Sequence, residues 1–203
     1  MMSTFSRKPL AIRDVLLVQQ RKVNDHRGYF FETFSHKDFD QIGISSDFVQ
    51  DNQSRSTRIG TIRGFHYQRP PAAQAKLVSV LKGRVLDVAI DIRHGSPTFG
   101  KFVSTELSAE LGQQLYIPTG FAHGFMTLED NVLVMYKVSA YYAPSLDAGI
   151  RWDDPDIAFP WPLRESEIIR SEKDGKLPAL KDFESPFPYN GNPLTSLAVC
   201  NFS

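Results

Sequence analysis

Residues 63–68, with the sequence RGFHYQ, and the lysine at position 76 bring together three side chains that can handle protons or anionic oxygens. Arg63 offers a planar set of donors for phosphate or carboxylate, and His66 can accept or release a proton near neutral pH. Gly64 lets the backbone bend or approach another segment closely. These residue types favour acid–base chemistry on an anionic substrate. Taken alone, however, the segment is better explained by a strand with one hydrogen-bonded structural histidine.

A second histidine lies in residues 118–123, PTGFAH, which have the P-x-G-x-x-H form found in the second half of the cupin signature. Cupins are small double-sheet barrels that often hold a metal with an H-x-H pair and a glutamate. Here the matching position reads His66-Tyr67-Gln68, so the pair is missing. Two histidines without thiolates fall short of the usual three or four metal ligands, and we therefore predict a site without a metal.

The interior of such a barrel would contain His66, His123, Lys76 and Arg63, together with Tyr136, which shares one face of its strand with two valines. A base, cations and a phenol suit proton abstraction next to a carbonyl: the base removes a proton, the cations hold the enolate oxygen, and the phenol returns a proton from the other side. Two alternatives remain open, since Tyr136 could be a core aromatic and Lys76 a solvated charge at a strand edge.

The composition of the 203-residue chain predicts a single domain over residues 1–203, with an irregular C-terminal tail from about residue 186. Lysine and arginine number 23, as do aspartate and glutamate, so no net charge attracts nucleic acid or an acidic membrane. Cys200 is the single cysteine, which excludes an intramolecular disulfide. The N-terminus lacks an apolar run for export, and no segment approaches the length of a membrane span. We expect a soluble cytoplasmic protein. The absence of Gly-x-Gly-x-x-Gly, P-loop and Gly-x-Ser-x-Gly motifs argues against the common nicotinamide, nucleoside-triphosphate and serine-hydrolase folds.

Short apolar segments separated by Gly, Pro, Asn and Asp indicate many short strands, typical of an all-β sandwich or barrel. Strands are expected at residues 14–18, 77–81, 85–92, 101–107, 115–118, 125–128 and 132–138. The pairs 77–81 with 85–92 and 125–128 with 132–138 are predicted to form antiparallel hairpins. Ser35 and Asp38 predict the start of a short helix ending near Gly43. Residues 53–58 read as a loop or an exposed strand, and a short helix is expected between 164 and 173.

The strand at residues 85–92 alternates clearly between two faces. One face carries Leu86, Val88, Ile90 and Ile92. The other face carries Asp87 and Asp91 beside small apolar residues, which predicts that it borders a polar cavity.

Together these residues resemble the dTDP-4-dehydrorhamnose 3,5-epimerases of nucleotide-sugar biosynthesis, from about residue 15 to about residue 183. The motifs that carry the resemblance are DHRGYFFE at 25–32, FVQDN at 48–52, RGFHYQ at 63–68, KLV at 76–78, PTGFAHGF at 118–125, YK at 136–137, WDDP at 152–155 and SEKD at 171–174. Each is weak alone, but their number and order make the resemblance strong. Phe65 departs from the pattern, because leucine is more usual at this position.

The resemblance implies an all-β, cupin-type double-sheet barrel, or jelly roll, with a few short helices and no cofactor. It also implies a homodimer in which exchanged N-terminal strands complete the partner's site. His66 would be the base with Asp174 behind it as a dyad, Tyr136 the acid on the opposite face of the sugar, and Lys76 the group that stabilises the enolate. From the residues alone, Asp174 is only an exposed acid near a helix end. The implied substrate-binding residues are Arg27, Phe30, Glu32, Gln50, Asn52, Arg63, His123 and Tyr142.

The implied reaction converts dTDP-4-dehydro-6-deoxy-D-glucose to dTDP-4-dehydro-L-rhamnose by inverting carbons 3 and 5, which both flank the ketone at carbon 4. Three alternatives remain: a single-centre epimerase of a related dTDP-4-keto-6-deoxy sugar, a non-catalytic sugar-nucleotide-binding cupin, and a metal-dependent cupin dioxygenase. Phe65 lies next to the proposed base, so the number of centres inverted stays open.

Overall fold

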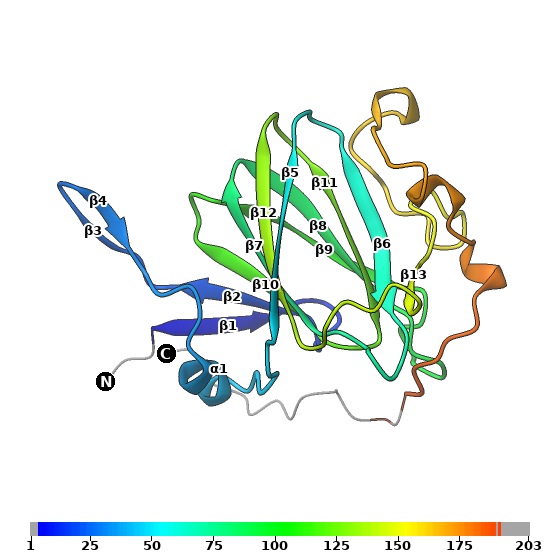
Figure 1. The fold of residues 1–203 in the computed structure, drawn as a ribbon, viewed down its shortest axis with the longest axis horizontal. Coiled ribbons are helices and arrows are strands. Elements are labelled where there is room, and N and C mark those ends of the chain that lie inside the picture. The colour runs from blue at the N-terminus through cyan, green and yellow to red at the C-terminus, as the bar shows by residue number, and fades with distance from the viewer. Residues whose placement is uncertain (1–3, 190, 192–203) are drawn as a thin grey trace.

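The computed structural model describes residues 4–189 and residue 191, which form two large antiparallel sheets and one small separate hairpin (Figure 1). The larger sheet has six strands in the order β1 (Phe5–Pro9), β2 (Leu16–Gln20), β10 (Gln113–Ile117), β7 (Lys76–Lys82), β12 (Val132–Val138) and β5 (Gln50–Ser56). The smaller sheet has five, in the order β13 (Asp147–Gly149), β6 (Ile62–Gln68), β11 (Phe121–Thr127), β8 (Arg84–Asp91) and β9 (Phe102–Ser108).

The remaining elements are short. They are the hairpin of β3 (Val23–Asp25) and β4 (Gly28–Phe30), helix α1 (His36–Gln41), and three single-turn 3₁₀ helices, η1 (Glu165–Glu167), η2 (Asp174–Lys176) and η3 (Leu180–Asp182). The predicted all-β fold of two sheets with a few short helices is thus confirmed. No helix in the described part of the chain has the length and apolar character needed to cross a bilayer.

The apolar core lies between the two sheets, where inward side chains of β7, β10 and β12 meet those of β8 and β11. Burial of these aliphatic and aromatic side chains supplies the main favourable term in folding, at roughly 25 cal/mol for each Å² removed from water. Val85 and Ala89 of β8 belong to this core, whereas Val88 and Ile90 pack on the outer side of their sheet. The alternation predicted for residues 85–92 is therefore confirmed.

Both outer faces are covered as well. Helix α1 packs Phe39 against Leu16 and Leu77 on the outside of the six-stranded sheet. The irregular segment after β13 lies along the five-stranded sheet, where Ile157 and Phe187 contribute to a third apolar cluster (Figure 1). This segment also contains η2, which carries a residue of the site.

Helix α1 forms where Ser35 and Asp38 predict it. The Ser35 side chain caps the helix by accepting a hydrogen bond from the Asp38 backbone N–H at 3.4 Å, and Gly43 follows with φ +74°. Residues 53–58, read as a loop or an exposed strand, lie largely in the edge strand β5. The helix expected between 164 and 173 is reduced to the single 3₁₀ turn η1.

The two predicted hairpins are wrong. Strand β7 pairs with β10 and β12, whereas β8, which follows it directly, pairs with β9 and β11 in the other sheet. Strands β11 and β12 are likewise consecutive but lie in different sheets. The tight turn at Gly83, with φ +78°, carries the chain across the core instead of back along the same sheet. A period-two pattern identifies a strand but does not identify its partner.

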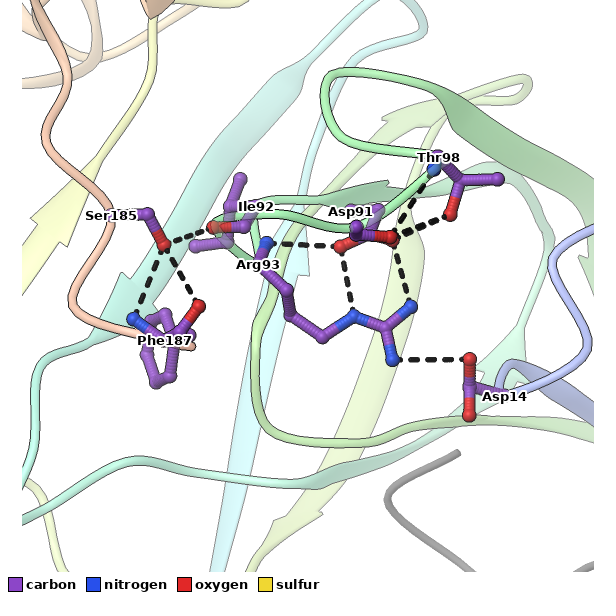
Figure 2. A network of polar contacts seen from close by, with 8 residues as sticks. Asp14, Asp91, Ile92, Arg93, Thr98, Ser185 and Phe187 are labelled. Carbon is purple, nitrogen blue, oxygen red and sulfur yellow. Dashed lines mark hydrogen bonds and ion pairs between the residues drawn. The ribbon is translucent and has the colours of Figure 1, made fainter. Parts of the chain in front are cut away.

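A buried polar network fastens the far end of β8 (Figure 2). The Asp91 carboxylate accepts hydrogen bonds from Arg93 Nε at 2.9 Å, from Ser96 Oγ at 2.6 Å and from Thr98 Oγ1 at 2.6 Å. The Arg93 guanidinium also forms an ion pair with Asp14 at 3.1 Å, in the loop between β1 and β2. Burial alone would raise the pKa of Asp91, but these donors outweigh it and hold the pKa below its usual range. Asp91 therefore serves this network, and of the two acids predicted to border a polar cavity only Asp87 contributes to the site.

The start of the predicted tail is bound to the rest of the fold. The backbone of His94 pairs with Phe187 and Tyr189, with N–O distances of 2.7 and 2.9 Å. Ser185 donates a hydrogen bond to the Ile92 carbonyl (Figure 2). Residues 190 and 192–203, which make up most of the predicted tail, lie outside the described residues.

Candidate active site

A cavity of about 490 Å³ opens between the two sheets. Its walls come from β5, β7 and β12 of the larger sheet, from β6 and β11 of the smaller sheet, and from residues 169–174. All four residues predicted to be catalytic line it, together with Arg63 and His123. The full lining is Ser54, Thr61, Ile62, Arg63, His66, Lys76, His123, Phe125, Tyr136, Ile169, Arg170, Ser171, Lys173 and Asp174.

His66 on β6 forms a hydrogen-bonded pair with Asp174 on η2. Its Nε2 lies 2.6 Å from Asp174 Oδ1, although 108 residues separate the two in sequence. Burial alone would raise the pKa of the Asp174 carboxyl, but hydrogen bonds from His66, from the Ser171 hydroxyl and from the Gly64 backbone keep it lowered. The ionised carboxylate accepts the Nε2 proton and leaves Nδ1 as the basic ring nitrogen.

The close packing of β6 and β11 depends on Gly64, whose φ is +128°. A Cβ there would lie 2.5 Å from Gly124 Cα and 2.7 Å from the His123 carbonyl oxygen. Only glycine permits this approach. It places His66 directly opposite His123 across the two strands, so that both histidines face the same cavity.

His123 and Lys76 form the deeper part of the site. His123 Nε2 lies 2.9 Å from Asp87 Oδ1, and burial lowers the pKa of His123 in spite of this carboxylate. Lys76 on β7 donates to the His66 carbonyl oxygen at 3.1 Å and is only 8% exposed. Burial lowers the pKa of Lys76 to about 8, against the opposing effect of Asp87 and Asp147.

Tyr136 on β12 faces the cavity from the opposite sheet to His66. Burial raises the pKa of its phenol, which keeps the hydroxyl protonated at neutral pH. Arg63 reaches across to β5, where its Nε donates to Ser56 Oγ at 3.2 Å and its Nη2 to the Arg55 carbonyl at 3.1 Å. The site therefore has His66 and Arg63 on one wall, and the protonated Tyr136 phenol with Lys76 on the other.

A second cavity of about 140 Å³ adjoins the first, because His66, Lys76 and Tyr136 line both. Its other lining residues are Gln50, Asn52, Tyr67, Gln68, Gln74, Tyr142 and Asp147. It thus brings together three of the predicted substrate-binding residues. The polar groups are linked: Gln50 Nε2 donates to Asn52 Oδ1 at 2.8 Å, and the Tyr142 hydroxyl donates to Asp147 at 3.0 Å.

Comparison with known proteins shows the family to which the chain belongs. The sequence model described as dTDP-4-dehydrorhamnose 3,5-epimerase matches residues 9–182. The chain belongs to the dTDP-4-dehydrorhamnose 3,5-epimerase family. A curated relative of that name from Sinorhizobium fredii is 48% identical over 180 residues, which cover 89% of this chain and 92% of that protein.

Solved structures of this epimerase family agree. The crystal structure of a dTDP-6-deoxy-D-glucose-3,5-epimerase from Legionella pneumophila, in complex with dTDP-4-keto-L-rhamnose, is 41% identical, has a TM-score of 0.85, and covers 91% of this chain and 97% of that one. A 3'-monoepimerase from Streptomyces bikiniensis in complex with dTDP-quinovose is 34% identical, with a TM-score of 0.78 and coverage of 85% and 87%. The predicted family and its cupin-type fold are confirmed.

Three residues that the family resemblance assigns to the nucleotide do not reach the cavities of their own chain. Arg27 and Phe30 are exposed on the β3–β4 hairpin, and Glu32 follows it. Figure 1 shows this hairpin projecting away from both large sheets. Among residues 4–189 and 191, no group of three or more His, Cys, Asp and Glu side chains is arranged to hold a metal ion.

Sequence reasoning missed several polar contacts of this epimerase site. Asp147 accepts hydrogen bonds from Tyr142 and Lys173, and so ties the second cavity to the segment that carries Asp174. No local pattern marks Asp147 as a partner of Lys173, because 26 residues separate them. Arg170 lines the main cavity without any assigned role.

Proposed function

We propose that this protein is an isomerase that converts dTDP-4-dehydro-6-deoxy-D-glucose to dTDP-4-dehydro-L-rhamnose by inverting carbons 3 and 5. The observation that carries the proposal is the placement of a carboxylate-backed histidine and a protonated phenol on opposite walls of one cavity. Inversion beside a ketone needs removal of a proton from one face and its return to the other. A binding protein has no need of that pair.

In the proposed mechanism, His66 Nδ1 removes the proton at carbon 3 or carbon 5, and the electron pair moves to the oxygen at carbon 4. The Lys76 ammonium, with His123 beside it, stabilises that enolate oxygen. Tyr136 then donates its proton to the opposite face of the same carbon. Positioned acid–base groups typically contribute about 10²- to 10⁴-fold, and one preorganised donor to an oxyanion about 3 kcal/mol. The net reaction changes no oxidation state, so it requires no redox cofactor.

The buried carboxylates Asp174 and Asp87 each contact one of the two histidines of the site. Asp174 supports the imidazolium that forms on His66 after proton removal, since a carboxylate favours the charged form. Asp87 holds the His123 ring in place through the contact between its Oδ1 and His123 Nε2, while burial lowers the pKa of His123. The low dielectric of the cavity strengthens each of these interactions relative to water.

The proposal includes the substrate-binding residues. Gln50, Asn52 and Tyr142 would hold the nucleotide in the second cavity, with Arg63 at the diphosphate. The Legionella pneumophila structure, a complex with dTDP-4-keto-L-rhamnose, supports a substrate of this class.

A homodimer with exchanged N-terminal strands is part of the proposal, and so is a cytoplasmic location. The β3–β4 hairpin supports the dimer, because Val23, Tyr29 and Phe30 are 59%, 60% and 72% exposed on an element away from its own cavity. Apolar side chains gathered in this way are typical of an interaction surface. In the dimer, the partner's hairpin would bring Arg27, Phe30 and Glu32 to the nucleotide.

Proton NMR of dTDP-4-dehydro-6-deoxy-D-glucose incubated with the protein in deuterated water tests the reaction. Deuterium at carbons 3 and 5 with inversion at both is the expected result, and His66→Ala should nearly abolish it while keeping the fold. Deuterium at one carbon only would instead make the protein a single-centre enzyme, an alternative favoured by its similarity to the 3'-monoepimerase from Streptomyces bikiniensis. No exchange at either carbon would contradict both.

A further inference from the structure

The main cavity has an excess of positively charged side chains in its lining. Its lining includes four basic side chains, Arg63, Lys76, Arg170 and Lys173, but only one carboxylate, Asp174, which is already bound to His66. A pocket lined by one sign of charge concentrates ligands of the opposite sign. The ligand expected near these side chains is therefore an anion.

The four cations differ in how far they are neutralised. Lys173 forms an ion pair with Asp147, and Lys76 lies deep in the cavity at the His66 carbonyl. Arg63 donates only to a hydroxyl and a carbonyl oxygen, so no carboxylate balances its charge. The Arg170 side chain forms no ion pair or hydrogen bond within residues 4–189 and 191, although its charge is one of several causes that lower the pKa of Asp153. Arg63 and Arg170 are thus the two guanidinium groups of the cavity that contact no carboxylate in the described part of the chain.

The backbone holds these two arginines close together. Residue 169 pairs in parallel with Thr61, through hydrogen bonds from Ile62 N to the Ile169 carbonyl at 2.8 Å and from Ile169 N to the Gly60 carbonyl at 2.9 Å. In sequence, Arg170 is the residue after Ile169, and Arg63 is two residues after Thr61. Both side chains line the same cavity.

A glycine makes room for the Arg170 guanidinium. A Cβ at Gly175 would lie 2.0 Å from Arg170 Nη1 and 2.8 Å from its Cζ, so the guanidinium rests against the bare backbone next to Asp174. The Ser54 side chain lines the same cavity, and its buried hydroxyl has no hydrogen-bond partner in the described part of the chain. A buried polar group without a partner costs free energy, which an anion in the cavity would relieve.

We propose that Arg170 binds the diphosphate of the nucleotide sugar together with Arg63, as a residue that sets affinity for the diphosphate. This inference rests on the proposed function. The diphosphate is joined directly to carbon 1 of the sugar, so it must lie in or beside the cavity that holds the ketone. A planar guanidinium can contact two phosphate oxygens at once, and two such groups match the two phosphates.

The test measures binding of dTDP and of thymidine to the full-length protein by calorimetry, for the wild type and for Arg170→Gln. Arg164→Gln is the matched control, because Arg164 belongs to the same segment, lines neither cavity, and pairs with Glu167. Arg170→Gln should weaken dTDP binding about 10-fold and leave thymidine binding unchanged. It should also raise KM about 10-fold with little change in kcat, since the contact is made equally in the ground state and the transition state. Arg170→Lys should recover part of the loss.

Unchanged dTDP affinity in Arg170→Gln would overturn the inference, as would an equal loss for thymidine and dTDP. The proposed function is judged separately, by turnover of the wild type in the same preparation. If the wild type is active and Arg170→Gln binds dTDP as tightly as the wild type does, only the role of Arg170 is refuted. An inactive wild type refutes the proposed function itself.

Discussion

Replacing Lys76 by methionine should make the protein more stable while removing its activity. The pKa of Lys76 falls from 10.5 to about 8 because the ammonium is buried. At about 1.4 kcal/mol for each unit of pKa, keeping the ammonium charged in this site costs about 3 kcal/mol of folding free energy at pH 7. Methionine has a similar length and no charge, but it leaves the His66 carbonyl without its donor. The expected net gain is therefore about 2 kcal/mol.

The pH dependence separates this explanation from simple repacking. The unfolded chain binds more protons than the native state between pH 8 and pH 10.4, so the wild type becomes more stable as the pH rises through that window. Lys76→Met lacks this group, and its advantage should shrink over the same range. Urea unfolding at pH 7 and at pH 10, at one fixed protein concentration, measures both effects. An advantage for Lys76→Met that is equally large at both pH values, or a loss of stability at pH 7, would refute the reasoning.

Three further predictions concern catalysis and folding. Asp174→Asn should lower kcat about 10²- to 10⁴-fold in a steady-state assay, because the amide can donate to His66 Nε2 and so leave the proton on Nδ1, the nitrogen proposed as the base. The control is Asp47→Asn, which disturbs the exposed contact between Asp47 and His36 and should leave kcat unchanged. The value of kcat/KM should fall above about pH 8 as Lys76 loses its proton, and a pH profile that stays flat to pH 10 would contradict its role. Arg93→Met should lower the free energy of unfolding by about 3–5 kcal/mol, because Asp91 loses its buried ion-pair partner. The pKa of Asp91 is lowered in the native state, so the wild type should also lose this stabilisation as the pH falls below about 4. Unfolding curves of both proteins at pH 7 and pH 3 measure the two effects.

The elements of the fold could be predicted from sequence where local chemistry decides them. Helix α1 forms because Ser35 satisfies a free backbone N–H, and β8 forms because its apolar residues alternate. The partners of the strands could not be predicted in this way. A turn such as the one at Gly83 serves equally well to reverse a strand within one sheet or to cross to the other sheet, and the choice depends on the whole core.

In the candidate site, too, some residues could be predicted from the local sequence and others only from the fold or the family. His66, Lys76 and Tyr136 could be singled out by residue type, and the structure places them around one cavity. Asp174 could not be joined to His66 from spacing, and only the family resemblance assigned it. Lys173 lies in the SEKD motif, but neither its spacing nor the family resemblance linked it to Asp147, and only the fold brings the two together.

The alternation of strands between sheets explains both the wrong hairpins and the construction of the site. Strands β6, β7 and β8 fall in the smaller, larger and smaller sheet in turn, and β10, β11 and β12 in the larger, smaller and larger. Had β6 and β7 paired as a hairpin, His66 and Lys76 would lie on one wall of the cavity. Because the chain crosses the core at each of these connections, His66 and His123 share one wall, and Lys76 and Tyr136 share the other. The topology thus places the proposed base and the proposed acid on opposite walls of the cavity, which is what inversion of a sugar carbon requires.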